Sequence, residues 1–488
     1  MASNNLKQKA VSGVIWTSIQ RFLSIFIQFI SGIILARLLS PEDYGCIGML
    51  TVFTMIATIV IDGGFGSALI QKKAPTDIDY STIFHWNVCL SILIYVVLYV
   101  AAPTIADFYH IELLCPVLRV QGLIVIIGAL QTIHVNMLNK QFKFKKISIV
   151  TLITSVVSLA ITIIMAYKGY GVWSLVAQNI LVNAIPCAIY WCTNHWFPKF
   201  VFSTKSFKEL FSFGVYMFLT SLMTQVVNNI QSLLIGRIYN ASTLGYFSKA
   251  NSTERLASTS ISQVMGQVTY PLYAEMQDEK ERLANTIKRI TLLLSYTTFP
   301  LMVLLILIAE PLFVLLYSDK WIPAVPYFQV LCLAGMALCL HSVNGLAIAA
   351  VGKSKAMFIW SVVKQSAGLV AILAGLYFWG MKGLLVGVVL RSWFVYVVNA
   401  SLVTYFIGYK IWRQVLDLMP VVLLTIVTFV ISYLIGHFVG KTLYITAIIQ
   451  VLSFISIYVT LSVVFKVEAY KLFIDTVSPL LSKIIHKK

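Results

Sequence analysis

The sequence predicts an all-α integral membrane protein with fourteen transmembrane helices, and three observations lead to this prediction. Hydrophobic residues make up 59% of the 488 residues and charged residues only 11%, with a mean hydropathy of +0.87. Apolar runs of membrane-spanning length recur along the chain. Lys and Arg are concentrated in every second loop between these runs. Soluble chains contain roughly 45–50% apolar and about 25% charged residues. The composition therefore excludes a water-soluble enzyme, a nucleic-acid-binding module and a disordered scaffold.

A helix needs roughly 20 apolar residues to cross about 30 Å of hydrocarbon. Runs that approach or exceed this length lie near 13–38, 46–70, 81–103, 116–138, 148–167, 172–193, 210–236, 290–316, 324–350, 356–377, 383–407, 418–438 and 442–465. A further segment, 244–273, is too polar to be recognised by hydropathy alone.

The distribution of basic residues indicates that segment 244–273 also crosses the membrane. Short cytoplasmic loops hold an excess of Lys and Arg. With fourteen spans and a cytoplasmic N-terminus, 24 of the 36 basic residues fall on the cytoplasmic side and seven on the far side. Without segment 244–273, the later loops would exchange sides and the bias would reverse. We therefore expect both termini to be cytoplasmic.

A weak internal repeat divides the predicted spans into two lobes. A shift of 200 residues places Gly45 on Gly245, Gly66 on Gly266, and the stretch 31–37 on 231–237. Each lobe has six spans, which is an even number, so the repeat is parallel and its pseudo-twofold axis runs along the membrane normal. Transporters of this kind bind substrate where the repeats meet. The predicted parts are an N-lobe (1–200), a C-lobe (201–410), two extra helices (411–466) and an amphipathic cytoplasmic tail (467–488).

Polar and basic residues inside the spans suggest a binding cavity for an anion. Charged side chains are costly in hydrocarbon, so they should face protein or water. Arg255 lies about 17 Å below the outer end of its span, on the polar face of segment 244–273. The predicted substrate-binding residues are Arg21, Arg255, Lys364 and Arg391, with Gln20, Gln28, Asn228, Asn251 and Ser258 from the polar helix faces.

Each of these residues has a structural alternative, such as snorkelling or pairing with another helix. Lys249 lies near the outer end of its span and is expected to snorkel, while Glu254 falls on the apolar flank as a structural partner. We find no metal-ligand spacing, nucleophile elbow or paired carboxylates. The sequence therefore predicts no enzyme activity, no metal and no cofactor.

Several motifs resemble the polysaccharide flippases of the multidrug/oligosaccharidyl-lipid/polysaccharide exporter superfamily, closest to the colanic-acid-exporter-like subgroup. They occur in the family's order over nearly the whole chain, at 35–45, 66–71, 211–214, 233–237, 244–247, 309–312 and 320–321. The resemblance implies an inner-membrane transporter that flips a polyprenyl-pyrophosphate-linked oligosaccharide for surface polysaccharide assembly. Membrane lipid, a polysaccharide polymerase and glycosyltransferases are the partners that it suggests. Arg21 corresponds to Ser221 in the repeat, so the lobes should hold substrate asymmetrically.

Two other functions remain open at this point. A cation-coupled multidrug exporter of the same superfamily would prefer intramembrane acids to capture cations, whereas this chain offers mainly bases. A membrane-embedded glycosyltransferase or ligase would need acidic or metal-binding residues on a sizeable outer loop, and the first outer loop supplies only Glu42 and Asp43.

Overall fold

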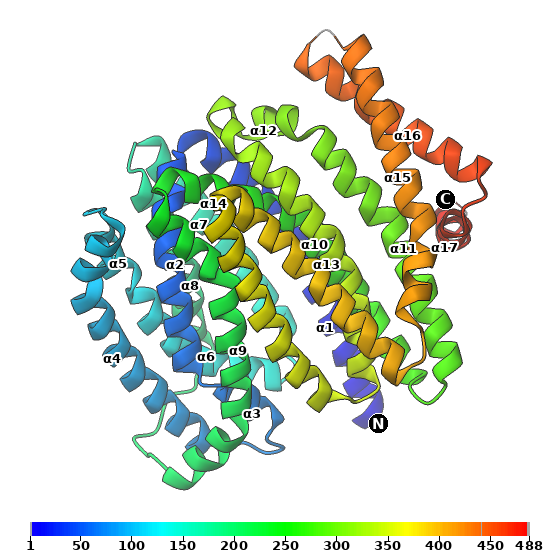
Figure 1. Ribbon diagram of the computed structural model, residues 1–488. Helices are drawn as coiled ribbons and strands as arrows, with labels where there is room; N and C mark the ends of the chain where they lie inside the picture. The colour runs from blue at the N-terminus through cyan, green and yellow to red at the C-terminus, as the bar shows by residue number, and fades with distance from the viewer. Residues whose placement is uncertain (1, 441, 486–488) are drawn as a thin grey trace. The chain divides into compact units, whose positions relative to one another are not determined.

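The computed structural model describes residues 2–440 and 442–485, and over these residues the chain forms helices and no strands (Figure 1). The helices are α1 (Ala2–Leu38), α2 (Pro41–Asp62), α3 (Phe65–Gln71), α4 (Asp77–Tyr109), α5 (Leu114–Gln121), α6 (Leu123–Lys140), α7 (Phe144–Tyr167), α8 (Val172–Thr193), α9 (Thr204–Ile238), α10 (Ala241–Glu275), α11 (Lys280–Leu307), α12 (Ala309–Tyr317), the 3-10 helix η1 (Asp319–Ala324), α13 (Val325–Ala350), α14 (Ser354–Phe406), α15 (Ile411–Val439), α16 (Leu443–Val464) and α17 (Glu468–Ile485). The last residues of the predicted tail, 486–488, lie outside the described part.

The described chain is a multi-pass membrane protein. Eleven helices are long and apolar enough to cross a membrane. The number is twelve if the two parts of α9, which meet at 56°, are counted as one span. The all-helical membrane class is therefore confirmed, whereas the count of fourteen remains a prediction.

Helix α14 contains two arms that fold back on each other. A straight helix of its 53 residues would be about 80 Å long, more than twice the thickness of the hydrocarbon core. Trp379 and Gly380 have non-helical backbone angles, and Gly380 has a positive φ of 59°. Gly375 and Gly383 approach so closely that a Cβ on either would overlap the backbone of the other. The two arms correspond to the predicted spans 356–377 and 383–407.

The helix α2 begins with a capping box encoded by the sequence Ser-Pro-Glu-Asp. The Ser40 hydroxyl accepts a hydrogen bond from the Asp43 backbone at 3.2 Å, and the Asp43 carboxylate accepts one from the Ser40 backbone at 2.9 Å. Pro41 occupies the first helical turn, where its missing N–H is tolerated. The motif that resembles the flippases therefore has a local structural role at the start of α2.

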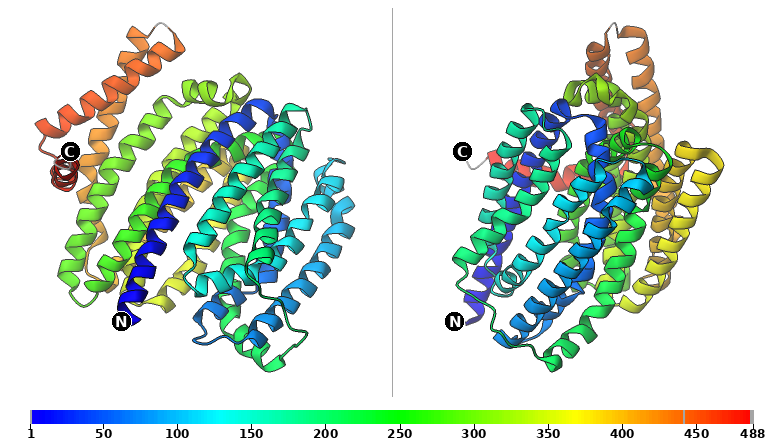
Figure 2. Two further views of the ribbon diagram at one scale, coloured as in Figure 1. Left: turned by 180° about the vertical axis from the view of Figure 1, so that it is seen from behind. Right: turned by 90° about the vertical axis from the view of Figure 1, so that its left-hand side faces the viewer.

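The chain forms two compact units, Met1–Ser248 and Lys249–Lys488. In each unit most helices run side by side, and in the second unit α17 runs across the direction of α15 and α16 (Figures 1 and 2). The predicted lobes divide near residue 200, whereas the compact units divide within α10. The physical reason is that α9 packs against α2, α3 and α4, and Gly64 meets the backbone of Gly214.

Helix α2 and the start of α10 meet in a reciprocal contact within the first unit. A Cβ on Gly45 would overlap the carbonyl of Ala241, and a Cβ on Gly245 would overlap the carbonyl of Pro41. The Ser242 hydroxyl donates a hydrogen bond to Glu42 Oε1 at 3.1 Å. Positions 41 and 241, 42 and 242, and 45 and 245 each differ by 200. A two-fold relation would produce such exchanged contacts, and the layout of the whole repeat remains a prediction.

Gly45→Ala is expected to destabilise the protein, because its methyl group would overlap the backbone of α10. Overpacking of this kind costs about 1–3 kcal/mol. Gly128→Ala is a matched control, since a Cβ at Gly128 of α6 meets nothing within 4 Å and alanine favours a helix. Thermal unfolding of both purified variants in detergent would check this. Equal melting temperatures for the two variants would contradict the expectation.

Candidate functional site

Three of the four predicted cations lie in the second unit and come together there. Arg255 is on α10, while Lys364 and Arg391 are on the two arms of α14. Arg255 lies near enough to Arg391 for their charges to repel each other, and Lys364 and Arg391 both act electrostatically on His341 of α13. We call Arg255, Lys364 and Arg391 the cationic cluster. Its members are far apart in the sequence, and the hairpin of α14 brings two of them together.

Neutral amide side chains hold two members of the cationic cluster. Lys364 Nζ donates a hydrogen bond to Asn399 Oδ1 at 2.8 Å, and Arg391 Nη2 donates one to Gln365 Oε1 at 2.8 Å. The Asn399 amide in turn donates to the carbonyl of His341 at 3.0 Å. Both hydrogen bonds link the two arms of α14, so the fold of the hairpin fixes where these cations lie.

The Arg391 side chain is further fixed by a glycine on the opposite arm. A Cβ on Gly368 would come within 2.6 Å of Arg391 Cγ and Cδ. Gly368 and Gln365 lie three residues apart and therefore on one side of the helix. In the first arm, Gly368 therefore contacts the aliphatic part of Arg391, and Gln365 binds its guanidinium.

Helix α10 exposes Arg255 but buries the residues beside it. Glu254 is 5% exposed and Ser258 fully buried, and Gly335 of α13 packs directly against the Glu254 carboxylate. Cys339 of α13 lies 3.6 Å from the Ser258 carbonyl oxygen. Ser258 therefore faces α13 and does not share the exposed side of Arg255, which differs from the sequence expectation. Because α10 packs against α13, its exposed face is narrower than the polar face that the helical period predicts, and Ser258 falls outside it.

The other predicted residues are placed as follows. Asn251 on α10 is half-buried. In the first unit, Arg21 and Gln20 on α1 are half-buried, Gln28 is exposed, and Asn228 on α9 is half-buried. Gln20 Nε2 donates to Ser24 on the same helix at 3.5 Å. Because Arg21 and these amides of α1 and α9 belong to the first unit, a cavity shared with the cationic cluster remains a proposal.

Lys249 is not a snorkelling side chain. It is 4% exposed, and its Nζ lies 4.0 Å from the ring centre of Tyr317 and 5.8 Å from that of Trp321. Stacking of an ammonium on aromatic rings is favourable where water is excluded. Lys249 therefore binds α10 to α12 and η1 and has a structural position separate from the cationic cluster.

The sequence reasoning missed Gln365, Asn399 and Gly368. Gln365 directly follows Lys364, and Asn399 is an amide within an apolar run, so both gave a weak signal. The missing information was the register of the hairpin. Once the turn at Trp379 and Gly380 is known, positions near 365 and 391 must lie opposite each other.

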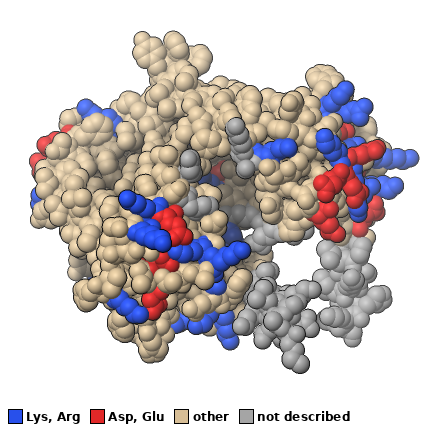
Figure 3. Space-filling model, turned by 90° about the horizontal axis from the view of Figure 1, so that it is seen from below, with Lys and Arg blue, Asp and Glu red and all other residues tan. Residues whose placement is uncertain are grey.

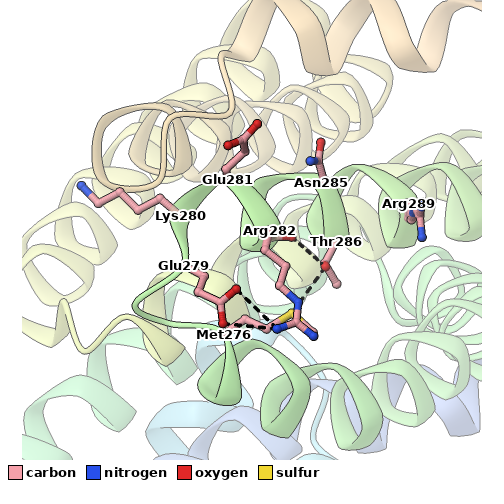
Figure 4. A pocket seen from close by; sticks show the side chains of 8 residues that line it. All are labelled: Met276, Glu279, Lys280, Glu281, Arg282, Asn285, Thr286 and Arg289. Carbon is pink, nitrogen blue, oxygen red and sulfur yellow. Dashed lines mark hydrogen bonds and ion pairs between the residues drawn. The ribbon is translucent and has the colours of Figure 1, made fainter.

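A hollow of about 740 Å³ lies at the turn between α10 and α11 (Figure 4). Its lining residues are Met276, Glu279, Lys280, Glu281, Arg282, Asn285, Thr286 and Arg289. Arg282 forms an ion pair with Glu279 at 3.2 Å. In the view from below, Lys and Arg side chains lie beside Asp and Glu side chains in mixed groups (Figure 3). The hollow therefore combines both signs of charge, unlike the cationic cluster. Among the described residues, no group of three or more His, Cys, Asp or Glu side chains is placed to hold a metal ion.

Comparison with known proteins gives a family and a fold. The family described as "Polysaccharide biosynthesis protein" matches residues 34–326. The chain is 28% identical to the teichuronic acid biosynthesis protein TuaB of Bacillus subtilis (strain 168), covering 73% of this chain and 74% of TuaB. It is 22% identical to the lipopolysaccharide biosynthesis protein WzxC of Escherichia coli (strain K12), covering 88% of each chain. The inward closed structure of the lipid II flippase MurJ superposes with a TM-score of 0.74 at 16% identity, covering 93% of this chain and 98% of MurJ.

Proposed function

Because the chain belongs to the polysaccharide biosynthesis protein family, we propose that it flips a polyprenyl-pyrophosphate-linked oligosaccharide across the bacterial inner membrane. The substrate would move from the cytoplasmic to the outer leaflet by alternating access and would serve the assembly of a surface polysaccharide. The protein would act as a transporter and not as an enzyme. The names of TuaB, WzxC and MurJ support this proposal, since they describe polysaccharide biosynthesis and lipid flipping.

The cationic cluster is the observation that carries the proposal. A diphosphate concentrates negative charge at the junction of lipid and sugar, and it has to pass the low-dielectric interior. Arg255 is exposed, although its position along α10 puts it near the middle of the predicted span. A guanidinium is costly in hydrocarbon, so we infer that Arg255 faces a wet cavity. There it would bind phosphate oxygens through paired, charge-assisted hydrogen bonds.

The rival functions receive less support from the described residues. A cation-coupled drug exporter would present acids to its cavity, but Glu254 is buried against Gly335. A glycosyltransferase or ligase would need an acidic outer site, but Glu42 binds Ser242 and Asp43 caps α2. In this proposal both outer-loop acids have structural roles.

The proposal can be tested by measuring how fast a substrate becomes exposed on the opposite leaflet. Purified protein would be reconstituted into vesicles with a fluorescent lipid-linked oligosaccharide, and a membrane-impermeant reagent would report its exposure. We expect protein-dependent exposure for lipid-linked oligosaccharides and none for a drug-like cation. An exposure rate equal to that of protein-free vesicles, for every candidate oligosaccharide, would refute the proposal.

Topology provides a separate prediction. A cysteine replacing Lys280, which is exposed at the start of α11, should react with an impermeant maleimide only from the cytoplasmic side. One replacing Lys320 in η1 should react only from the outer side, because this threading puts 24 basic residues inside and seven outside. The exposed native Cys89 and Cys192 would first be changed to serine. Labelling of position 280 from outside would refute the threading.

A further inference from the structure

We propose that Gln365 and Asn399 are positioning residues that hold Arg391 and Lys364 in place without cancelling their charge, so that the cationic cluster selects a polyanionic group of the diphosphate class. This inference rests on the proposed function, because it concerns the same substrate site. Beyond the proposed function, it names Gln365 and Asn399 as the residues that position the cations, and it explains why both are amides.

The first step concerns geometry. A Lys or Arg side chain has many rotamers, and ordering it on binding reduces affinity. The hydrogen bonds from Lys364 to Asn399 and from Arg391 to Gln365, both 2.8 Å long, order these side chains before substrate arrives. Gly368 adds a second contact on the Arg391 stem. The cations are therefore pre-organised by the pairing of the two arms.

The second step concerns charge. An amide oxygen accepts a hydrogen bond from a cation but has no net charge, whereas a carboxylate in the same position would offset the charge. Within the described residues, Lys364 forms no ion pair with a carboxylate, and its hydrogen-bond acceptor is Asn399. The carbonyl of His341 fixes Asn399 in turn, at 3.0 Å. A site that keeps several positive charges close together will favour a ligand with several negative charges.

Gln365→Glu gives a sharper test than a change of Asn399, because Asn399 also donates a hydrogen bond to the carbonyl of His341. The substitution keeps the size and the acceptor oxygen but adds a negative charge beside Arg391. Gln365→Ala removes the Gln365 acceptor of Arg391 and leaves the charge of the cluster unchanged. If Gln365 preserves charge, glutamate should weaken anion binding more than alanine does. A purely structural role would give the reverse order, because glutamate retains the hydrogen bond.

The experiment would measure binding of inorganic pyrophosphate to the purified full-length protein in detergent, together with thermal unfolding. We expect Gln365→Glu to raise the Kd roughly tenfold or more, with a melting temperature equal to or above that of the unchanged protein. Gln365→Ala should raise the Kd by a smaller factor. Gln277→Glu, at the exposed turn between α10 and α11, adds the same charge outside the cluster and should bind pyrophosphate normally.

The possible results separate this inference from the proposed function. If the unchanged protein flips substrate and binds pyrophosphate, but Gln365→Glu binds as well as Gln365→Ala or better, the positioning role is refuted while the function stands. If the unchanged protein flips substrate without binding pyrophosphate, the inference fails at this site. If it does neither, the proposed function itself fails, and the inference with it.

Discussion

Arg255→Ala is expected to abolish or strongly reduce surface polysaccharide production, while the protein remains expressed and inserted. Arg255 is exposed on α10 and lies near enough to Arg391 for their charges to repel each other, and we propose that a substrate diphosphate binds there. Hydrogen bonds to charged groups contribute about 1.5–3 kcal/mol each, so their loss should reduce transport by roughly tenfold or more. Polysaccharide on the cell surface and protein in the membrane fraction would be quantified together.

Two further variants distinguish binding from structure at this position. Arg255→Lys should be partly functional, since an ammonium keeps the charge but loses the fork of the guanidinium. Arg282→Ala removes an arginine whose side chain is 61% exposed and paired with Glu279, and it should export normally. If Arg255 instead neutralises Glu254, the alanine variant would fold poorly and the added Glu254→Gln change would restore export. Normal export by well-expressed Arg255→Ala protein would exclude substrate binding by this residue.

A cross-link between positions 42 and 242 is expected to stop flipping completely and reversibly. Alternating access requires the two ends of the transporter to open in turn, and Glu42 and Ser242 lie in the reciprocal contact of α2 with α10. Holding this contact closed would prevent that end from opening. The two cysteines of the Glu42→Cys/Ser242→Cys protein would be joined by a short thiol-reactive cross-linker with a reducible bond. The rate of substrate flipping in vesicles would then be measured before and after reduction.

The two single-cysteine proteins are the controls, since the same reagent cannot join positions 42 and 242 in them. They should flip substrate at the normal rate, and reduction should restore the rate of the cross-linked protein. A cross-linked protein that flips normally would show that this contact stays closed during transport. In that case the opening would have to occur elsewhere in the fold.

Much of the fold follows from properties that the sequence displays locally. The low charge content and the apolar runs require helices in a membrane, because only helices satisfy their backbone hydrogen bonds within a single segment. Ser40, Pro41 and Asp43 start α2 through contacts over three residues. Gly380 ends the first arm of α14, since its positive φ of 59° favours glycine. The intramembrane cations could also be identified, because a charge within an apolar run is conspicuous.

Only the tertiary structure decided which of these residues meet. The helical period gives the face on which Lys364 or Arg391 lies, but the register of two packed helices sets its partner. Packing also buried Ser258 against α13 and placed Lys249 on the rings of Tyr317 and Trp321. The sequence by itself therefore determined the membrane class, the approximate spans and the presence of cations within apolar segments. The pairing of those cations with Gln365 and Asn399 was decided by packing, because side-chain contacts between helices depend on the position of every neighbour.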